Sequence, residues 1–338
     1  MRWIDINEAP FKISGLKHID REKGEYYRLP LDVIDTISKN VSSLARCSAS
    51  GRVRFRTDSR TLSIRYKVKG RVPNGVLSVN ANNYAALYIN NEYDGSCIKT
   101  YEDDDSYYLL EANDGHLSND INDIMIYLPM RDTITVMEIG VDESANLWEP
   151  KPYTYETPIV FYGSSIVQGL TGSHSGRSYV DQTCRRLDSE YLNLGFSGCA
   201  RGEDNIAKYI ASLKMSIFVM DYDHNAPDVE HLKNTHERFF KIFRSVQKDT
   251  PVVMISKPNF FPWIKEDYER REVIRNTYLN AKNSGDENVY FIDGESFFGT
   301  GPDRYECTSD ALHPNDLGMN KMADVVEPLL RKILEKSI

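Results

Sequence analysis

The pattern of apolar residues changes along this chain, and the change restricts the folds that the chain can adopt. From about Arg52 to Val141, apolar and polar residues alternate in short runs such as 61–68. After Pro158, continuous apolar runs are separated by helical stretches. Alternation is typical of half-buried antiparallel strands, whereas continuous apolar strands joined by helices are typical of a buried parallel sheet. We therefore expect two domains of different architecture.

Residues 1–145 are predicted to form an antiparallel β-sandwich or jelly-roll domain, because short strands recur between turn clusters. The predicted strands cover residues 52–56, 61–68, 84–89, 107–111, 124–128 and 134–139. The stretch 146–158 holds three prolines and has no periodicity. We interpret residues 146–157 as a stiff linker.

Residues 158–338 are predicted to form an α/β domain with a flavodoxin-like, five-stranded, doubly wound parallel sheet. Strands that are apolar throughout are buried on both faces, and the helices between them require right-handed crossovers. The predicted strands are 159–162, 191–194, 217–220, 252–255 and 289–292. The predicted helices are 179–187, 204–213, 229–246, 268–282 and 317–335.

Length and charge limit the classes of function. At 338 residues, the chain exceeds the size at which a single hydrophobic core stops growing, which also favours two domains. The net charge is −9 and no Lys/Arg-rich run stands out, so we expect neither nucleic acid nor a membrane as a partner. A neutral or cationic small substrate fits this charge better. The oligomeric state stays open, and a homo-oligomer is one alternative.

The cysteines and the N-terminus bear on the cellular compartment. The five cysteines are widely scattered without a Cys-x-x-Cys pair, which indicates reduced thiols rather than a disulfide framework or a zinc site. The first residues lack the apolar run of a secretory signal, and no segment approaches the roughly 20 apolar residues of a membrane span. We expect a cytoplasmic protein, although a chain trimmed of its signal would look the same.

Two distant segments carry candidate groups for catalysis. A predicted strand ends in the turn Gly163-Ser164-Ser165, and a serine at such a junction can lie exposed at the carboxyl edge of a parallel sheet. Far along the chain, Asp310 and His313 stand three residues apart, so that a carboxylate and an imidazole can face one point. Together these groups suggest a serine hydrolase.

Four separated segments resemble the four sequence blocks of the SGNH (GDSL-like) hydrolase superfamily, and they occur in its order. Residues 163–165 resemble the nucleophile block, and 193–198 resemble the glycine block. Residues 223–225 stand where the asparagine block follows the third strand, and 310–313 match the Asp-x-x-His block. The resemblance covers the predicted α/β domain, and the preceding β region is similar to the N-terminal domains of some members.

The resemblance implies a role for each of these groups. Ser165 is the implied nucleophile, His313 the base that takes its proton, and Asp310 the carboxylate that holds the imidazole tautomer. The implied donors to the oxyanion are the backbone N–H groups of Ser165 and Gly198 and the side-chain amide of Asn225. Each such donor is typically worth about 3 to 4 kcal/mol of barrier.

Two positions depart from the superfamily pattern. Ser164 stands where members usually have Asp, and this second hydroxyl beside Ser165 makes it an alternative nucleophile. Residues 221–224 stand before Asn225, where a glycine pair is usual. Bulky polar side chains at these positions would narrow the pocket or contact the substrate.

Further residues are candidates for substrate contacts. Phe260, Phe261 and Trp263 follow the fourth predicted strand, where aromatic rings can stack on sugar faces, although buried anchors are equally common. His174 lies in a loop of small residues after the nucleophile, where an exposed histidine is the simpler interpretation. The candidate substrate-binding residues are Ser164, His174, Asp223, His224, Phe260 and Trp263.

A metal site is the alternative use of the polar residues near the third strand. Asp221, Asp223, His224 and His313 offer oxygen and imidazole donors that suit zinc or manganese. Their spacing is not that of a metal-ligand motif, so we interpret the aspartates as hydrogen-bonded loop carboxylates. We expect no metal and no cofactor.

The predicted function is that of a serine esterase that forms an acyl-enzyme on Ser165 and hydrolyses short acyl esters. O-acetyl groups on carbohydrates are the expected substrates, by analogy with the superfamily. One alternative is a lysophospholipase or thioesterase that acts on longer acyl chains and needs an apolar tunnel. The other is a non-catalytic carbohydrate-binding protein that keeps the hydrolase frame.

Overall fold

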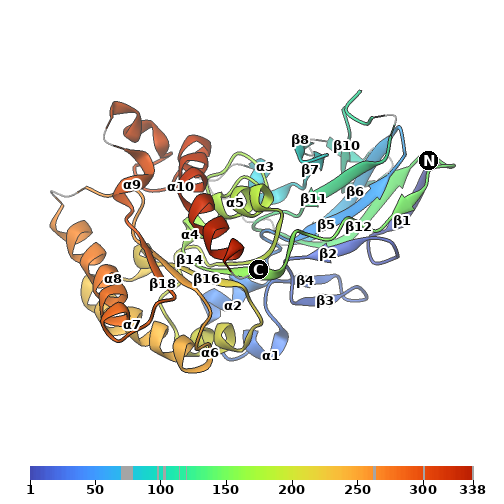
Figure 1. The fold of residues 1–338 in the computed structure, drawn as a ribbon. Coiled ribbons are helices and arrows are strands. Elements are labelled where there is room, and N and C mark those ends of the chain that lie inside the picture. Colours follow the sequence, from blue (N-terminus) through green and yellow to red (C-terminus); the bar gives the residue numbers. More distant parts are fainter. Residues whose placement is uncertain are drawn as a thin grey trace. The chain divides into compact units, whose positions relative to one another are not determined.

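The computed structural model of this protein describes residues 1–69, 79–96, 99–101, 104–113, 115–118, 120–261, 264–299 and 301–336. The chain forms two compact units, whose elements are labelled in Figure 1. The first unit contains Met1–Pro30, Ala45–Tyr153 and Gly172–Arg177. The second contains Leu31–Leu44, Thr154–Thr171 and Ser178–Ile338. Each unit thus includes a short segment that lies in sequence within the other.

Antiparallel sheets form the first unit. Its strands are β1 (Arg2–Asp5), β2 (Lys12–Ser14), β3 (His18–Asp20), β4 (Glu25–Tyr27), β5 (Arg52–Thr57), β6 (Leu62–Lys69), β7 (Ala86–Ile89), β8 (Glu92–Ser96), β9 (Lys99–Tyr101), β10 (Asp104–Glu111), β11 (Asn122–Tyr127), β12 (Thr133–Val141) and β13 (Leu147–Trp148). One sheet has the order β1-β12-β6-β10-β9 and another the order β13-β5-β11-β7-β8, with β2 beside β5. Strands β3 and β4 form a separate pair, and helix α3 (Val79–Asn83) precedes β7.

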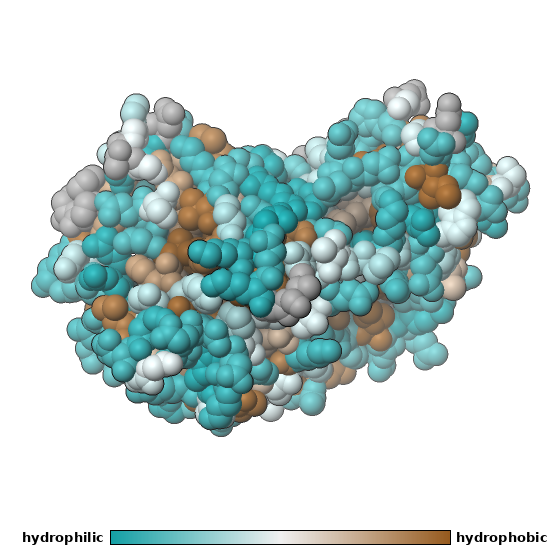
Figure 2. Space-filling view, in the orientation of Figure 1, coloured by the Kyte–Doolittle hydropathy of each residue, from teal (hydrophilic) through white to brown (hydrophobic). Residues whose placement is uncertain are grey.

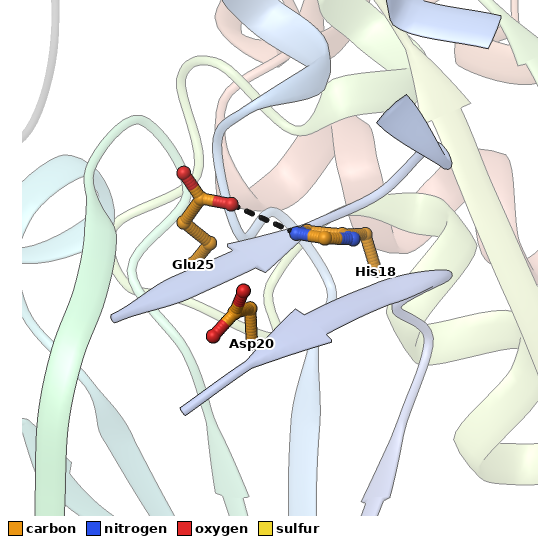
Figure 3. Close-up of side chains that lie close together, drawn as sticks. All are labelled: His18, Asp20 and Glu25. Atoms are coloured by element: carbon orange, nitrogen blue, oxygen red, sulfur yellow. Dashed lines mark hydrogen bonds and ion pairs between the residues drawn. The ribbon is translucent and has the colours of Figure 1, made fainter. Parts of the chain in front are cut away.

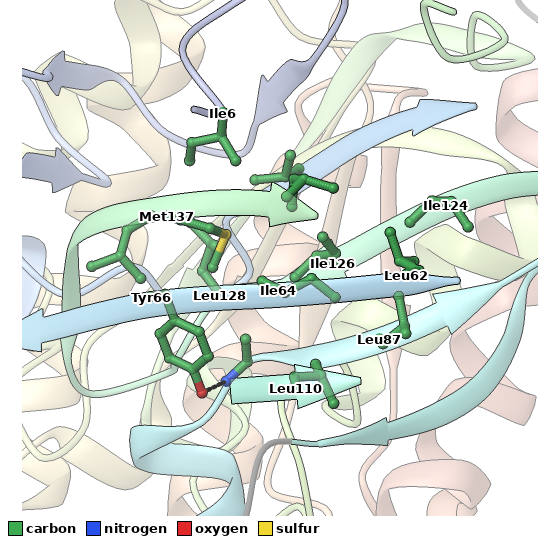
Figure 4. Close-up of a cluster of buried hydrophobic side chains, with 14 of the residues drawn as sticks. Ile6, Leu62, Ile64, Tyr66, Leu87, Leu110, Ile124, Ile126, Leu128 and Met137 are labelled. Carbon is green, nitrogen blue, oxygen red and sulfur yellow. Dashed lines mark hydrogen bonds between the residues drawn. The ribbon is translucent and has the colours of Figure 1, made fainter. Parts of the chain in front are cut away.

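Apolar side chains from both larger sheets fill the core of the first unit (Figure 4). On β6, every second residue from Leu62 through Ile64 to Tyr66 belongs to this core, as the alternating sequence pattern predicts. Ile124 and Ile126 of β11 contribute from the other sheet. The hydroxyl of Tyr66 also accepts a hydrogen bond from the Ala85 backbone N–H at 2.9 Å, so this buried polar atom has a partner.

Part of the segment interpreted as a linker pairs with the first unit. Strand β13 lies beside β5, and two β5 arginines hold the residues that follow it. Arg54 donates a hydrogen bond to the Lys151 carbonyl at 2.8 Å, and Arg56 donates one to the Glu149 carbonyl at 2.9 Å. The prolines of this stretch lack an N–H group and cannot donate to a neighbouring strand. The stretch is attached to β5 through its carbonyl groups, which accept hydrogen bonds from the two arginines.

The second unit contains a parallel sheet with the strand order β15-β14-β16-β17-β18. Its strands are β14 (Tyr155–Gly163), β15 (Ser189–Gly195), β16 (Ile217–Asp221), β17 (Val252–Ile255) and β18 (Val289–Ile292). This order is the flavodoxin-like one, and the five-stranded parallel sheet expected from the sequence is confirmed.

Helices cover both faces of this sheet (Figure 1). The α-helices are α1 (Leu31–Ile34), α2 (Lys39–Ala45), α4 (Ser165–Gln168), α5 (Tyr179–Leu187), α6 (Asp204–Ser212), α7 (Val229–Val246), α8 (Lys265–Asn283), α9 (Glu295–Phe298) and α10 (Asp316–Glu335), and the 3-10 helices are η1 (Asp223–Asn225) and η2 (Pro302–Cys307). Helix α5 contacts α10, whereas α7 contacts both α6 and α8.

Three neighbouring strands of the parallel sheet end at the same level. Gly163, the last residue of β14, pairs with Gly195 of β15 and with Asp221 of β16. The Ser164 N–H donates to the Asp221 carbonyl at 3.1 Å, and the Phe196 N–H donates to the Gly163 carbonyl at 2.8 Å. The loops that follow these strands therefore begin beside one another.

Hydrophilic residues dominate the face of the molecule in Figure 2, where hydrophobic residues form small separate groups. Among the helices of the described ranges, none is both long enough and apolar enough to cross a bilayer.

A Gly163→Ala substitution tests the close approach of β14 and β16. A Cβ at this position would clash with the Asp221 carbonyl oxygen and with the Val167 side chain, neither of which is free to move away. We expect the free energy of unfolding in urea to fall by about 3 kcal/mol. In the control Gly301→Ala, the new Cβ meets no atom within 4 Å, and we expect a change within about 0.5 kcal/mol. Equal effects of the two substitutions would contradict this account.

Candidate active site

The two adjacent serines after β14 have different environments. Ser164 is the N-cap of α4, and its hydroxyl accepts a hydrogen bond from the Ile166 N–H at 3.2 Å. Ser165 is the first residue of α4, and the position gives its backbone N–H no acceptor within the helix. Gly169 ends this single turn with a φ of 92°, a left-handed conformation that glycine adopts without strain.

Ser165, His313 and Asp310 form a continuous hydrogen-bonded chain. The Ser165 Oγ lies 2.9 Å from His313 Nε2, and His313 Nδ1 lies 2.7 Å from Asp310 Oδ2. Because a carboxylate accepts hydrogen bonds only, Nδ1 carries the proton and Nε2 is the acceptor of the serine proton. The structure therefore brings together the three residues for which the superfamily resemblance implies catalysis, and it places Ser165 rather than Ser164 beside the imidazole.

The carboxylate of Asp310 is held in its ionised form. Burial alone would raise the pKa of this group, but hydrogen bonds outweigh it and the pKa lies below its ordinary value. The second oxygen, Oδ1, accepts from the backbone N–H groups of His313 at 2.7 Å and of Leu312 at 3.0 Å. An ionised Asp310 orients the ring of His313 and can stabilise a positive charge on this ring.

Two side chains outside the sequence blocks hold the loop that carries His313. Ala311 has a φ of 65°, a left-handed conformation that is unfavourable for alanine. Asn259, from the loop after β17, donates to the Ala311 carbonyl at 2.5 Å. Thr171 donates to the Pro314 carbonyl at 2.7 Å. Sequence reasoning did not identify Asn259 or Thr171, because both act on backbone carbonyl groups and no residue pattern reveals such contacts.

A hydrogen bond connects the glycine loop after β15 to helix α4. The Ser197 N–H donates to Gln168 Oε1 at 3.0 Å. Gly198 has a φ of 72°, and a Cβ built there would meet no atom within 4 Å, so its backbone borders open space. The Ala200 N–H donates to Asn225 Oδ1 at 3.3 Å. This bond directs the oxygen of the Asn225 amide toward the glycine loop. The Nδ2 group lies on the other side of the amide and is not the partner of this bond.

The aspartates at the end of β16 face the interior rather than solvent. Asp221 is fully buried, and its Oδ2 accepts from the Tyr179 hydroxyl at 2.9 Å. Asp223 is 1% exposed, and its Oδ2 accepts from the Lys257 N–H at 3.0 Å. Burial, together with the charge of Asp223, raises the pKa of Asp221 to about 8. Burial also raises the pKa of Asp223, although the Lys257 N–H and the charge of Arg270 oppose it.

His224 is likewise an interior side chain, of which 5% is exposed. Burial lowers its pKa to about 3, and the positive charges of Lys257 and of protonated His313 act in the same direction. His224 is therefore a neutral imidazole. Asp221, Asp223 and His224, which stand where the superfamily usually has a glycine pair, are thus buried rather than open to solvent.

The remaining candidate substrate contacts lie in different surroundings. His174 belongs to a segment of the first unit, where its ring stacks on Tyr93 at 3.8 Å between centroids and its Nε2 lies 3.1 Å from the Tyr88 hydroxyl. Phe260 is 2% exposed, and the Arg271 guanidinium covers its ring. Trp263 lies outside the described residues.

Phe261, one of the aromatic residues that follow the fourth predicted strand, pairs with a tyrosine that the sequence prediction missed. Tyr305 of η2 is 60% exposed, and its ring stacks on Phe261 with centroids 6.2 Å apart and an angle of 20°. The Arg304 guanidinium lies over both rings, at 4.8 Å from Phe261 and 5.5 Å from Tyr305. Tyr305 precedes the Asp-x-x-His block by only a few residues, and this proximity was the one signal in the sequence that could have identified it.

Within the part of the chain that the structure describes, one group of residues has the donor types and proximity to hold a metal ion. His18, Asp20 and Glu25 lie on the β3-β4 pair of the first unit, with their ligand atoms within 4.8 Å of one another (Figure 3). These side chains already have partners, since His18 bonds Glu25 at 2.9 Å and Asp20 pairs with Lys23 at 2.8 Å. The four residues considered as metal ligands from the sequence form no such group among the described residues.

Two family descriptions match consecutive parts of the sequence. Residues 156–331 match the GDSL-like Lipase/Acylhydrolase family. Residues 1–147 match a domain described as the N-terminus of Esterase_SGNH_hydro-type. Among curated proteins, none matches the chain significantly. The expected resemblance to SGNH hydrolases is confirmed.

Solved structures share the whole two-part architecture. A protein described as a GDSL-like lipase from Bacteroides ovatus is 25% identical, with a TM-score of 0.85 over 99% of this chain and 98% of the other. A salicylyl-acyltransferase from a tetracycline biosynthetic pathway is 17% identical, with a TM-score of 0.77 over 98% and 97%. An acetyl xylan esterase from the rumen bacterium Butyrivibrio proteoclasticus is 12% identical, with a TM-score of 0.63 over 99% and 98%.

The Asp221→Asn substitution tests the buried carboxyl group beneath the site. An unfolded aspartate loses its proton near pH 3.8, whereas folded Asp221 keeps it to higher pH. Between these values the folded state binds more protons, so this group makes the protein less stable as the pH rises. Asparagine cannot ionise and still accepts the Tyr179 hydrogen bond.

We therefore expect Asp221→Asn to stabilise the protein relative to wild type by at least about 1 kcal/mol more at pH 8.5 than at pH 5, as measured by urea unfolding. The exposed Asp249→Asn is the control for the removal of one charge. A difference between variant and wild type that does not change with pH would show that Asp221 is ionised throughout.

Proposed function

Because the chain belongs to the GDSL-like lipase/acylhydrolase family, we propose that it is a serine esterase that cleaves short acyl esters through an acyl-enzyme on Ser165. The observation that carries the proposal is the contact between Ser165 Oγ and His313 Nε2 at 2.9 Å, with Asp310 on the other ring nitrogen. A serine hydroxyl is a weak nucleophile unless a base accepts its proton during attack, and His313 is placed to do so.

The proposed reaction has two acyl-transfer steps. Ser165 Oγ attacks the ester carbonyl carbon while His313 Nε2 takes the hydroxyl proton, and the carbonyl oxygen becomes an oxyanion. Collapse of this intermediate breaks the bond to the alcohol oxygen, which receives the proton from His313. Water then attacks the acyl-enzyme with His313 again as base, and Ser165 is regenerated as the acid leaves.

The proposed oxyanion donors come from three adjacent loops. They are the Ser165 N–H at the start of α4, the Gly198 N–H beside open space, and the Nδ2 of Asn225. The level ends of β14, β15 and β16 support this grouping, because each donor follows one of these strands. Fixed donors of this kind stabilise the charge that develops on the carbonyl oxygen.

The proposed substrates are O-acetyl esters of carbohydrates. Carbohydrate esterases, including an acetyl xylan esterase, share the architecture of both units, and they are the support for this substrate class. The Phe261–Tyr305 pair, of which Tyr305 is exposed, offers aromatic faces of the kind that stack on sugar rings. We propose that it contacts the sugar of the substrate.

Transfer of the acyl group to an alcohol instead of water is a second candidate activity. It is favoured by the likeness to a salicylyl-acyltransferase, which extends over nearly all of both chains. The acyl-enzyme on Ser165 would be common to both activities. They differ only in whether water or an alcohol accepts the acyl group.

Paired serine substitutions test the nucleophile. We expect Ser165→Ala to lower kcat/KM for p-nitrophenyl acetate by at least about 10⁴-fold and to abolish labelling by a fluorophosphonate probe. Ser164→Ala removes an N-cap, so we expect a loss of about 1 kcal/mol in stability and activity within about tenfold of wild type. Activity that survives Ser165→Ala but not Ser164→Ala would reverse the assignment.

A substrate series tests the acyl group and the acceptor. We expect faster release of acetate than of octanoate from p-nitrophenyl esters, and acetate release from acetylated sugars. A strong preference for octanoate would favour the lysophospholipase or thioesterase alternative. Alcohol added to the assay distinguishes transfer from hydrolysis, because transfer yields a new ester in place of acetate. A wild-type protein that reacts with no ester and no probe would leave the non-catalytic carbohydrate-binding alternative.

A further inference from the structure

One buried arginine binds both ends of the turn that carries Asn225. Arg270 lies on α8 and is 7% exposed. Its Nη1 donates to the Asp223 carbonyl at 2.6 Å, and its Nη2 donates to the Ala226 carbonyl at 3.0 Å. These two carbonyl groups lie on either side of Asn225 in the chain, so the guanidinium spans the turn.

The guanidinium is itself fixed in orientation. Glu266, one helical turn earlier on α8, accepts from Arg270 Nε at 2.9 Å and from Nη2 at 2.8 Å. A guanidinium is planar and presents its donors in a rigid fork, so the edge that Glu266 holds also fixes the direction in which Nη1 points. The position of the turn is thereby set relative to α8.

Neighbouring residues attach the same turn to the next loop of the sheet. The Asp223 carboxylate accepts from the Lys257 N–H at 3.0 Å, and the Lys257 ammonium pairs with Asp267 at 2.7 Å. Asp267 stands one helical turn before Arg270, and it also accepts from the Phe261 N–H at 3.3 Å. One face of α8 therefore holds the turn after β16 and the loop after β17.

We propose that Arg270 is a positioning residue of the oxyanion hole, and this inference rests on the proposed function of Asn225. Arg270 contacts the backbone of the turn rather than the substrate. Its effect reaches the reaction through Asn225, whose Oδ1 is already bound by the Ala200 N–H. A small displacement of the turn would move the amide donors from the place where the oxyanion forms, and misplacement by about 1 Å can cost about 100-fold in rate.

Arg270→Lys is the first test, because lysine keeps the charge but offers a single ammonium that cannot reach two carbonyl groups and Glu266 together. We expect kcat to fall between about 10-fold and 100-fold with KM within about threefold of wild type. The matched control is Arg275→Lys, which lies on the same helix, is half exposed and pairs with Glu272. We expect its kinetics to equal those of wild type.

A double-substitution cycle separates positioning from general damage. If Arg270 acts through Asn225, Arg270→Lys will lower kcat in the wild-type background but not in an Asn225→Ala background. Equal loss in both backgrounds would overturn the proposal while leaving the role of Ser165 intact. If Arg270→Lys does not fold, Glu266→Gln takes its place in the cycle, because it weakens the support of the guanidinium from an exposed position. Equal loss of kcat from Glu266→Gln in both backgrounds would again overturn the proposal.

Amide hydrogen exchange supplies a readout that does not depend on activity. The Ala200 N–H is shared between Asn225 Oδ1 at 3.3 Å and the Phe196 carbonyl at 3.1 Å. We expect faster exchange at this N–H in Arg270→Lys, as in Asn225→Ala, because the side-chain acceptor is displaced in one case and absent in the other, which leaves the Phe196 carbonyl as its single acceptor. If the wild-type protein hydrolyses no ester, the proposed function fails and exchange at Ala200 decides alone. Exchange equal to that of wild type would then overturn the positioning role, and faster exchange would support it.

Discussion

The close approach of the three strands β14, β15 and β16 at their carboxyl ends is the constraint on which the site depends. Gly163 leaves no room for a side chain against the Asp221 carbonyl. Because the strands end level, the first loop residues Ser164 and Phe196 donate hydrogen bonds to the last residues of the neighbouring strands, Asp221 and Gly163 respectively. Ser165, the glycine loop and the Asn225 turn are therefore all anchored to the backbone at one edge of the sheet.

The parallel sheet and its helices could be predicted from the sequence because burial controls their patterns. Strands β17 and β18 and helices α5 and α7 have the predicted bounds. The elements that the sequence did not reveal are short or mixed in composition, such as β1, whose partner β12 lies more than a hundred residues away. Such strands are stabilised by pairing with a strand that is distant in sequence, and their own residues show no alternation of apolar and polar side chains that would predict them.

The site shows the same division between local and distant information. The chain Ser165–His313–Asp310 follows residue types that the resemblance singled out, and the structure brings these groups together. Asn259, Gln168 and Arg270 could not be recognised, because each binds a backbone group of a loop that is remote in sequence. The departure at residues 223–224 has a physical explanation that the sequence hides. Both side chains turn inward, where Asp223 joins the charges that hold the turn.

The interleaving of the two units has a consequence for how such a protein can be divided or inherited. Residues 31–44 belong to the α/β unit, where Asn205 binds the Thr36 carbonyl at 2.9 Å, and residues 172–177 belong to the β unit, where Ser175 binds the Tyr84 carbonyl at 2.9 Å. No single cut in the polypeptide yields two intact pieces. Gene recombination at one breakpoint would not transfer either unit complete. We therefore expect the two units to have been inherited together.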